Sequence, residues 1–332
     1  MRKIYLAAVI FCFLAFMNLL SGFPSMKNSD DFEMIEDLSI GVEAGDENLM
    51  FGIVNDIDLD GEGNIYVLDV RNYRIQKFDN KGSFLQSVPI KKGEGPQEVP
   101  RINTIAVTEK GKIYLLGGNG IKILLFDEHG EFLRFFKLDF QAIHIAPYVE
   151  EKAVVLGIKD NHIFHVFSEE GEHLDSFGEP FEIPSRYSQY KDLAPLKFPM
   201  RIDGSGDGKL FVLNPHRYEI NIYEKNKFVG LLKGKNKAFE PLRITKSNLP
   251  GIGIVFPTVS ALEYKERVYV TFRTILDEEV PNQLDIFEKG IPIASLDVDG
   301  FAYAIDKEGR LYFVEEEDFP KVVRYTPKKK TS

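Results

Sequence analysis

The stretch NIYVLDVRNYRIQKFDNKGSFL, residues 64–85, decides how this chain folds. Its first run, Ile65 to Leu68, is a short apolar strand, and a second strand, Arg74 to Phe78, follows after a polar turn. Gly82 marks another turn before a third strand begins at Phe84. The stretch therefore predicts short antiparallel strands that are joined by tight turns.

The same pattern occurs six times along the 332 residues. In each copy an apolar strand precedes a second strand, which ends in an aromatic residue and a turn. These aromatic residues are Phe78, Phe126, Phe167, Tyr223, Phe287 and Tyr325. Four short strands repeated with a period of roughly 40 to 50 residues are typical of propeller blades. The sequence predicts an all-β chain in which residues 34–326 form one six-bladed β-propeller with four-stranded antiparallel blades.

The last copy provides only three strands before residue 332. Far upstream, Leu38 to Glu43 alternates apolar and polar residues and has no partner of its own. We expect a closing strand at about 36–44 that pairs with the last blade and removes two exposed sheet edges. Residues 327–332, with Lys328 to Lys330, are expected to form a solvated basic tail.

The first copy also resembles a known repeat. Its Asp60-x-x-Gly63-Asn64-Ile65-Tyr66 start, with the residues at 69, 72, 74, 78, 79 and 82, closely resembles the NHL repeat, whose architecture is a β-propeller. Residues 210–224 follow the same framework, and Lys92 to Glu98 resembles the Gly-Glu-Gly-Pro connector of secreted bacterial six-bladed propellers. The resemblance implies the propeller fold and an exported protein.

Asp69 and Arg74 lie at the two ends of a tight connection between neighbouring strands. An ion pair that closes this turn is the natural physical interpretation. Because most other copies lack the pair, we expect each such pair to contribute modestly, as exposed or half-exposed pairs do. The predicted role of these two residues is structural.

Blade topology assigns the loops to two ends of the disc. The turns between strands one and two, and between three and four, lie at one end, and the remaining connections lie at the other. The long segments 89–100, 178–200, 233–259 and 273–281 all belong to the second end, where binding usually resides. The predicted ligand-binding face carries Arg71, Tyr73, Asn119, Asp160, Arg186, Tyr187, His216, Arg217, Arg243 and Arg273. Its cationic and aromatic side chains favour an anionic or carbohydrate-like ligand, a peptide or an acidic protein.

The amino terminus predicts export. Arg2 and Lys3 precede an apolar run over residues 4–20, followed by small residues, so residues 1–22 are interpreted as a signal peptide or an uncleaved membrane anchor. The expected location is periplasmic or extracellular. The only cysteine, Cys12, lies inside this leader, so we expect neither disulfides nor thiol chemistry after its removal. The net charge of −10 disfavours nucleic acid as a partner, and we expect a monomer.

The sequence contains no standard nucleophile or zinc signature of the Gly-x-Ser-x-Gly or His-Glu-x-x-His type and no phosphate-binding loop. His162 and His165 would point to opposite faces of a strand and could not share a metal ion there. Asp56 to Gly61 imitates the first half of an EF-hand loop, but Val67 stands where the twelfth ligand is required. The segment Asp203 to Gly208 fails in the same way, with Asn214 at that position.

Two functions follow from these observations. The favoured one is a secreted or periplasmic, non-catalytic binding module that uses its loop-rich face and needs no cofactor. The alternative is a metal-dependent lyase or lactonase-like hydrolase with a calcium or zinc ion in the central channel. For that alternative, His144 and His216 are the candidate ligands.

Overall fold

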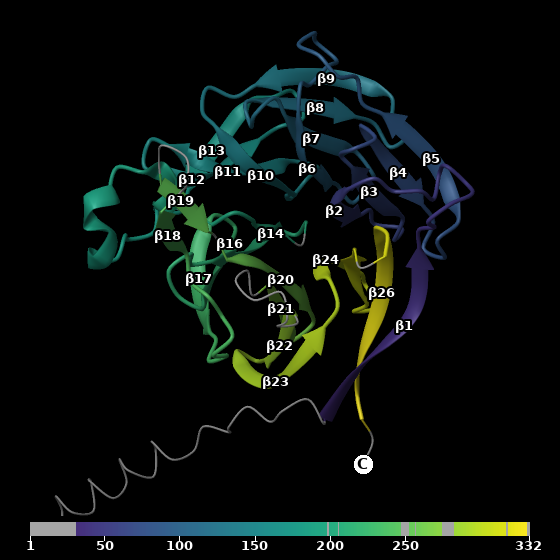
Figure 1. The fold of residues 1–332 in the computed structure, drawn as a ribbon. Coiled ribbons are helices and arrows are strands. Elements are labelled where there is room, and N and C mark those ends of the chain that lie inside the picture. The colour runs from purple at the N-terminus through teal and green to yellow at the C-terminus, as the bar shows by residue number, and fades with distance from the viewer. Residues whose placement is uncertain are drawn as a thin grey trace, which may run out of the picture.

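The computed structural model describes residues 31–197, 199–204, 206–246, 252–255, 257–273, 282–316 and 318–330. Six four-stranded antiparallel sheets are arranged around a central axis, and each presents its first strand to that axis (Figure 1). The predicted fold class is therefore confirmed. The leader expected at residues 1–22 lies outside the described residues.

The strands of each blade follow one another from the axis to the rim. Blade 1 contains β2 (Val54–Leu59), β3 (Ile65–Asp69), β4 (Arg74–Phe78) and β5 (Phe84–Pro89). Blade 2 contains β6 (Ile102–Val107), β7 (Ile113–Gly117), β8 (Lys122–Phe126) and β9 (Phe132–Lys137). Blade 3 contains β10 (Ala142–Pro147), β11 (Ala153–Lys159), β12 (His162–Phe167) and β13 (His173–Phe177).

The second half repeats this order. Blade 4 contains β14 (Asp203–Gly204), β15 (Lys209–Leu213), β16 (Glu219–Glu224) and β17 (Lys227–Lys233). Blade 5 contains β20 (Thr258–Tyr264), β21 (Arg267–Arg273), β22 (Asn282–Glu288) and β23 (Ile291–Val298). Blade 6 contains β24 (Phe301–Ile305), β25 (Leu311–Glu315), β26 (Lys321–Lys329) and, as its outermost strand, β1 (Phe32–Ile40).

Closure of the ring by the amino-terminal strand is confirmed, with shifted boundaries. β1 pairs antiparallel with β26, from Phe32 opposite Lys329 to Ile40 opposite Val322, so it starts and ends about four residues before the expected strand. It ends where Gly41, with a φ of 141°, passes close to the backbone of Lys321. Because β26 continues to Lys329, the first two lysines of the expected solvated tail are part of the sheet.

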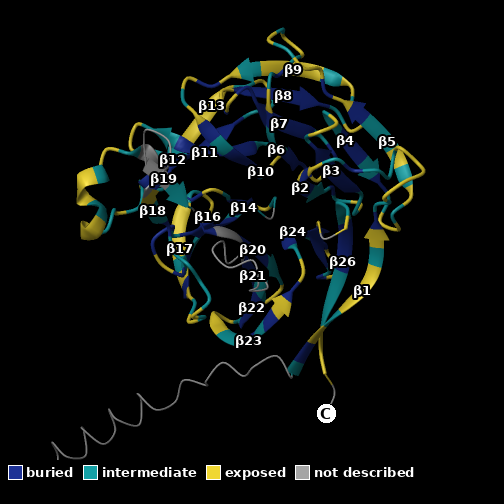
Figure 2. Cartoon of the chain, in the orientation of Figure 1, coloured by how far each residue is buried: buried dark blue, intermediate teal, exposed yellow. Residues whose placement is uncertain are grey.

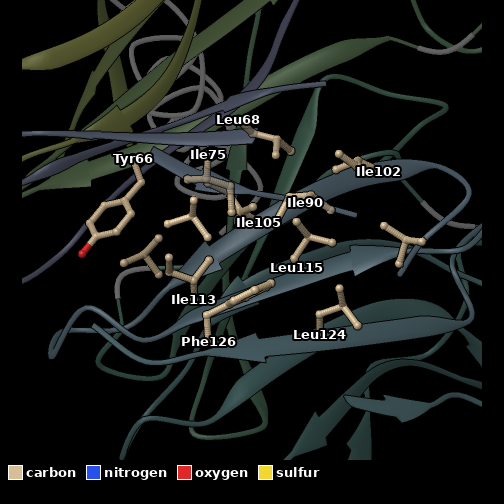
Figure 3. Close-up of a cluster of buried hydrophobic side chains, with 13 residues drawn as sticks. Tyr66, Leu68, Ile75, Ile90, Ile102, Ile105, Ile113, Leu115, Leu124 and Phe126 are labelled. Atoms are coloured by element: carbon tan, nitrogen blue, oxygen red, sulfur yellow. The ribbon is translucent and has the colours of Figure 1, made fainter. Parts of the chain in front are cut away.

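Apolar side chains fill the space between neighbouring blades. Figure 3 shows one such cluster, in which Leu68 and Ile75 of blade 1 face Ile105, Leu115 and other residues of blade 2. Each fully buried side chain of this size stabilises the fold by about 1.5–3 kcal/mol relative to an exposed one. Burial falls toward the rim, where strands such as β9 and β1 are largely exposed (Figure 2).

In blades 1 to 3, the residue that follows the end-of-strand aromatic builds the turn between the third and fourth strands. In blade 1, the Asp79 carboxylate accepts hydrogen bonds from the backbone N–H groups of Lys81 (2.9 Å) and Ser83 (2.8 Å). Gly82 takes a φ of 81°, a conformation that suits glycine. Asp127 forms the equivalent contacts in blade 2. The aromatic residue, the polar residue that follows it and the glycine of the sequence pattern therefore form this turn.

Two long connections carry structure of their own. The segment between blades 3 and 4 contains the short 3-10 helices η2 (Ser185–Tyr190) and η3 (Ala194–Lys197), and the segment between blades 4 and 5 contains a hairpin of β18 (Arg243–Lys246) and β19 (Ile252–Val255). The expanded turn expected at 273–281 lies beyond Arg273 outside the described residues. In the part of the chain described, no helix has the length and apolar character needed to cross a membrane.

Candidate binding sites

An axial cavity of about 470 Å³ opens among the turns between first and second strands. The innermost strands of all six blades contribute to its wall, together with turn residues such as Gly61, Glu109, Asp207, Lys265 and Lys307. The cavity therefore opens at the end of the disc opposite the predicted ligand-binding face. Its volume is within the range of small-molecule sites.

Arg201 crosses the axis and ties three blades together. It lies just before β14 of blade 4, where its Nε donates to Asp203 (2.7 Å). One Nη group donates to Asp56 of blade 1 (3.0 Å), and the other donates to the carbonyl of Tyr303 in blade 6 (2.9 Å). A guanidinium group with its fixed fork of donors suits such a junction. Arg201 and its two carboxylate partners therefore form a network across the inner part of the channel.

The same acidic side chains protect the inner sheet edges. An innermost strand has backbone N–H groups on its axial side without a neighbouring strand. Asp56 accepts from the N–H of Ile105 (3.2 Å), and Asp58 accepts from that of Val107 (2.7 Å), both on β6 of the next blade. Asp203 accepts from the N–H of Ala261 on β20 (2.8 Å). These carboxylates join neighbouring blades where sheet pairing cannot.

Asp58 has an unusual protonation equilibrium. Burial raises its pKa from 3.8 to about 7, although the hydrogen bonds from Val107 and Leu59 act in the opposite direction. Its side chain is one of those that line the axial cavity. Burial also raises the pKa of Asp203, which the charge of Arg201 opposes. Asp58 is therefore close to half ionised near neutral pH.

His144 of β10 lies deep in the axial cavity and is only 8% exposed. Its Nε2 is 3.4 Å from the hydroxyl of Thr104, which itself donates to the carboxylate of Asp56. Because that hydroxyl has a single proton, the network assigns the imidazole proton to Nε2 and leaves Nδ1 as an acceptor. Nδ1 has no partner among the described residues. Burial lowers the pKa of His144 to about 3, so the ring is neutral.

At the opposite end, several predicted ligand-binding residues have structural roles. Tyr73 packs against the cluster between blades 1 and 2, and its hydroxyl donates to the carbonyl of Pro100 (2.7 Å). It therefore holds the connector that follows blade 1. Arg71 and Asn119 are exposed on the turns of blades 1 and 2, and Asp160 is exposed on that of blade 3. The structure does not gather these residues into one site.

Four predicted residues do come together beside blade 4. The guanidinium of Arg186 lies 4.8 Å from the ring centre of Tyr187, whose ring is 6.0 Å from that of His216. His216 is buried, and its Nε2 is 2.8 Å from the carbonyl of Leu196. Arg217, the next residue, is exposed. This cluster joins η2 to the turn that follows β15.

Arg243 begins the neighbouring β18 and forms an ion pair with Glu240 (2.8 Å). The preceding residue, Leu242, accepts a hydrogen bond from the hydroxyl of Tyr187 (2.9 Å). Arg273 ends β21, and the position of its side chain is outside the described structure. The connection between blades 4 and 5 is thereby attached to the Tyr187 cluster.

A lateral groove of about 540 Å³ lies between blade 4 and the segment that leaves blade 3. Its wall includes His216 and Arg217 from the predicted set, and it continues along β16 to the exposed ring of Phe228. Phe181, Glu182, Asn214 and Asn221 also line the groove. The groove is therefore a cavity whose wall includes residues of the predicted ligand-binding face.

The Asp69–Arg74 ion pair is present, with 3.2 Å between Nε and Oδ2. Asp69 is fully buried, and its Oδ1 accepts from the backbone N–H groups of Gly52 (3.1 Å) and Ile53 (3.2 Å). Arg74 also donates to the carbonyl of Met50 (2.7 Å). The pair therefore fixes the entry to blade 1 as well as its own turn, and it is more buried than the exposed or half-exposed pair expected from the sequence.

The two histidines named for a metal-dependent enzyme contribute to different cavities. His144 lines the axial cavity, whereas His216 lines the lateral groove. Within the described ranges, no group of three or more His, Cys, Asp or Glu side chains is arranged to hold a metal ion. Asp56 and Asp203, which begin the two EF-hand-like stretches, instead both bind Arg201.

Sequence reasoning missed Arg201 and the role of Asp58. A signal for Asp58 was present, because Asp56 and Asp58 are two residues apart on an innermost strand and so face the same side. Arg201 had no comparable signal, since its partner Asp56 is 145 residues away in the chain. Only closure of the ring brings them together.

Comparisons with known proteins agree with this architecture. Residues 23–179 match the DUF5128 family, which is described as a 6-bladed beta-propeller. No curated protein matches the chain.

Solved structures match nearly the whole chain at low sequence identity. A Bacteroides fragilis protein that is described as exported has a TM-score of 0.61 at 10% identity, covering 92% of this chain and 99% of its own. A duf4221 family member from Bacteroides vulgatus has a TM-score of 0.60 at 11% identity, covering 91% and 99%. A streptogramin B lyase has a TM-score of 0.53 at 12% identity, covering 90% and 98%. At such identities the likeness is one of fold, and the fold they share with this chain is the β-propeller.

Proposed function

We propose that this protein is an exported, non-catalytic binding module that holds a carbohydrate-like ligand in the lateral groove. The observation that carries the proposal is the combination of amide, cationic and acidic side chains with an exposed aromatic ring in one cavity of about 540 Å³. Binding sites of proteins with rigid scaffolds commonly lie on such elaborated connections.

The chemistry of the groove suits a sugar. Hydroxyl groups need both donors and acceptors, and the amides of Asn214 and Asn221 offer both. Arg217 adds donors, and Glu182 adds acceptors. Phe228 is 57% exposed and provides an apolar surface for the C–H face of a sugar ring.

The cluster of Arg186, Tyr187 and His216 beside the groove holds the neighbouring connecting segments in place. His216 directs Nε2 to the carbonyl of Leu196, and Tyr187 directs its hydroxyl to the carbonyl of Leu242. Burial lowers the pKa of His216, and the hydrogen bond to the Leu196 carbonyl acts in the opposite direction. Because these polar groups hold the connecting segments in place, they support a rigid binding surface.

Export is part of the proposal. It is supported by the leader pattern at residues 1–22 and by the exported Bacteroides fragilis protein of similar fold. The NHL-like residues of the first blade and the Gly-Glu-Gly-Pro connector favour a propeller of the secreted bacterial type. A fusion of residues 1–22 to a periplasmic reporter enzyme should direct that reporter out of the cytoplasm.

The binding proposal is tested with a panel of immobilised oligosaccharides, followed by calorimetric titration of any that is retained. Phe228→Ala should weaken binding about tenfold, because loss of aromatic stacking costs roughly 1–1.5 kcal/mol. Its melting temperature should stay the same since the ring is exposed. Leu133→Ala, which removes an exposed apolar side chain from β9 of blade 2, is the matched control. Failure of every oligosaccharide to bind, or equal affinity of Phe228→Ala and the parent, would overturn the proposal.

A further inference from the structure

The outer edge of blade 4 is a surface that the proposed function does not use. β17 is the outermost strand of its sheet, and in the part of the chain that the structure describes no further strand pairs with its outer side. Such an edge presents backbone N–H and C=O groups that can pair with another extended chain. Most of β17 is exposed to solvent (Figure 2).

Three side chains of β17 form an exposed apolar strip. Phe228, Val229 and Leu231 are 57%, 54% and 39% exposed, whereas Leu232 is buried in the cluster between blades 4 and 5. In the described structure, the outer strands β5, β13 and β23 each expose one large apolar side chain. Single exposed apolar residues are normal on a protein surface, but a contiguous group of them marks an interaction site.

Lysines flank the apolar strip on both sides. Residues 225–239 contain five lysines and no acidic residue, although the whole chain has a net charge of −10. All five are exposed, namely Lys225, Lys227, Lys233, Lys235 and Lys237. Lys233 forms an ion pair with Glu219 (3.4 Å), and its side chain is still 67% exposed. This edge of an acidic molecule is therefore basic and attracts anionic groups.

The strand is held at both ends by the rest of the molecule. Asn226, in the turn that precedes β17, donates to the carboxylate of Asp175 and accepts from the hydroxyl of Tyr148, both in blade 3. After the strand, the N–H of Gly234 donates to the carbonyl of Tyr218 (2.9 Å). Because the edge is already ordered, a partner that binds it does not have to order it.

The charges of β17 favour one kind of partner. Antiparallel pairing with β17 of a second copy would bring Lys227 of one chain near Lys233 of the other, and like charges opposite each other are destabilising. A lipid surface would leave the outward backbone groups without hydrogen-bond partners. An extended protein segment supplies those partners, and its acidic residues would compensate the lysines.

We propose that β17 binds an extended acidic segment of a partner protein, which adds to blade 4 as a fifth strand. The apolar side chains of that segment pack on the apolar strip, and its carboxylates face Lys227 and Lys233. Because a β-bulge at Val229 interrupts the ladder, regular backbone pairing is expected from Gly230 onward. This site does not depend on the carbohydrate proposal, although Phe228 borders both surfaces.

The test uses the full chain without its leader and a fluorescent, acetylated peptide of sequence Glu-Glu-Val-Thr-Val-Thr-Val-Glu-Glu. Fluorescence anisotropy should show saturable binding that weakens as salt is added, since exposed charges are screened. The same peptide with lysines in place of its glutamates should bind at least about tenfold more weakly. N-methylation of the central valines and threonines should abolish binding, because it removes the backbone donors that strand addition needs.

A variant of the strand identifies the surface. Lys227→Glu combined with Leu231→Thr should weaken binding of the acidic peptide at least about tenfold, because it removes one attractive charge and part of the apolar strip. Lys137→Glu combined with Leu133→Thr makes the same exchange at exposed positions of β9 in blade 2 and is the matched control. The control should bind within about twofold of the parent, since surface exchanges away from a site have small effects. Both variants retain Phe228, so they should keep the oligosaccharide affinity of the parent.

Equal binding of the acidic and basic peptides, or binding that N-methylation leaves unchanged, would overturn the proposal even if the β17 variant failed to fold. Failure of the parent to bind the acidic peptide, or the same affinity in the β17 and β9 variants, would also overturn it. Binding of the parent to phosphatidylglycerol vesicles but not to the peptide would assign this edge to a lipid surface instead. Failure to bind any oligosaccharide would overturn only the proposed function of the groove.

Discussion

At the scale of the residue, Asp69 forms more contacts than the repeat pattern predicted. The sequence predicted its pairing with Arg74 across a turn, and that pair is present. The structure adds that the carboxylate is fully buried and also accepts the backbone N–H groups of Gly52 and Ile53. A buried carboxylate is tolerated when its acceptors are satisfied in this way. Asp69 is therefore an anchor for the segment that enters blade 1.

Asp58 gives a prediction on pH and stability. Its folded pKa of about 7 lies above the ordinary 3.8, so the folded state holds a proton that the unfolded chain releases between these values. The contribution of Asp58 to the free energy of unfolding is therefore present at low pH and is lost as pH rises from about 4 to about 7. Asp58→Asn should gain stability relative to the parent between pH 5 and pH 8. Urea unfolding at the two pH values measures this, and a difference that does not change with pH would contradict it.

Titration of His144 changes the free energy of unfolding with pH in the opposite direction to that of Asp58. Its effect must therefore be separated from that of Asp58 in the same experiment. Its folded pKa of about 3 lies below 6.5, so its contribution to stability is present above pH 6.5 and is lost as pH falls toward 3. Comparing Asp58→Asn with the parent cancels this contribution, because both chains contain His144. The parent alone would show the sum of the two effects.

At the scale of the element, β1 depends on a strand that lies at the far end of the chain. Phe32 and Ile40 are 4% and 3% exposed, and they mark the two ends of its pairing with β26. Only residues 38–40 of the predicted alternation at 38–43 belong to this strand, and its start was missed because residues 33–37 are mostly polar and exposed. Burial of a few well-placed apolar residues and pairing along β26 decide its extent.

Truncation of Phe32 tests this closure. Phe32→Ala should lower the free energy of unfolding by about 3–5 kcal/mol, because a large buried ring is replaced by a cavity. Ile35→Ala, on the same strand but 40% exposed, should change it by no more than about 0.5 kcal/mol. Urea unfolding followed by tyrosine fluorescence is the measurement. Similar losses for the two variants would show that β1 contributes by pairing alone.

At the scale of the whole molecule, Arg201 connects blades 4, 1 and 6 across the axis. Apolar packing holds neighbouring blades together, but this network links blades that are not neighbours. Removal of one partner from a buried ion pair leaves an uncompensated charge, which costs more than the pair itself contributes.

Arg201→Met should therefore lower the free energy of unfolding by about 3–5 kcal/mol. Adding Asp56→Asn and Asp203→Asn to the same chain should recover part of the loss, because the stranded carboxylates are then neutral. Calorimetric melting of the parent, the single variant and the triple variant measures this. A triple variant less stable than Arg201→Met would show that these carboxylates contribute through their backbone hydrogen bonds rather than through the ion pairs.

The sequence by itself determined the six-bladed architecture, since strand periodicity and end-of-strand aromatics recur in every copy and glycine turns recur in most of them. It also determined closure by the amino-terminal strand and the Asp69–Arg74 turn, whose partners are either alternating patterns or near neighbours. Only the tertiary structure decided which polar residues meet. Arg201, Asp56 and His144 come from different blades, and Arg186, Tyr187 and His216 come from a connection and a turn. Their proximity depends on how the ring closes and how long connections fold back, which no local pattern encodes.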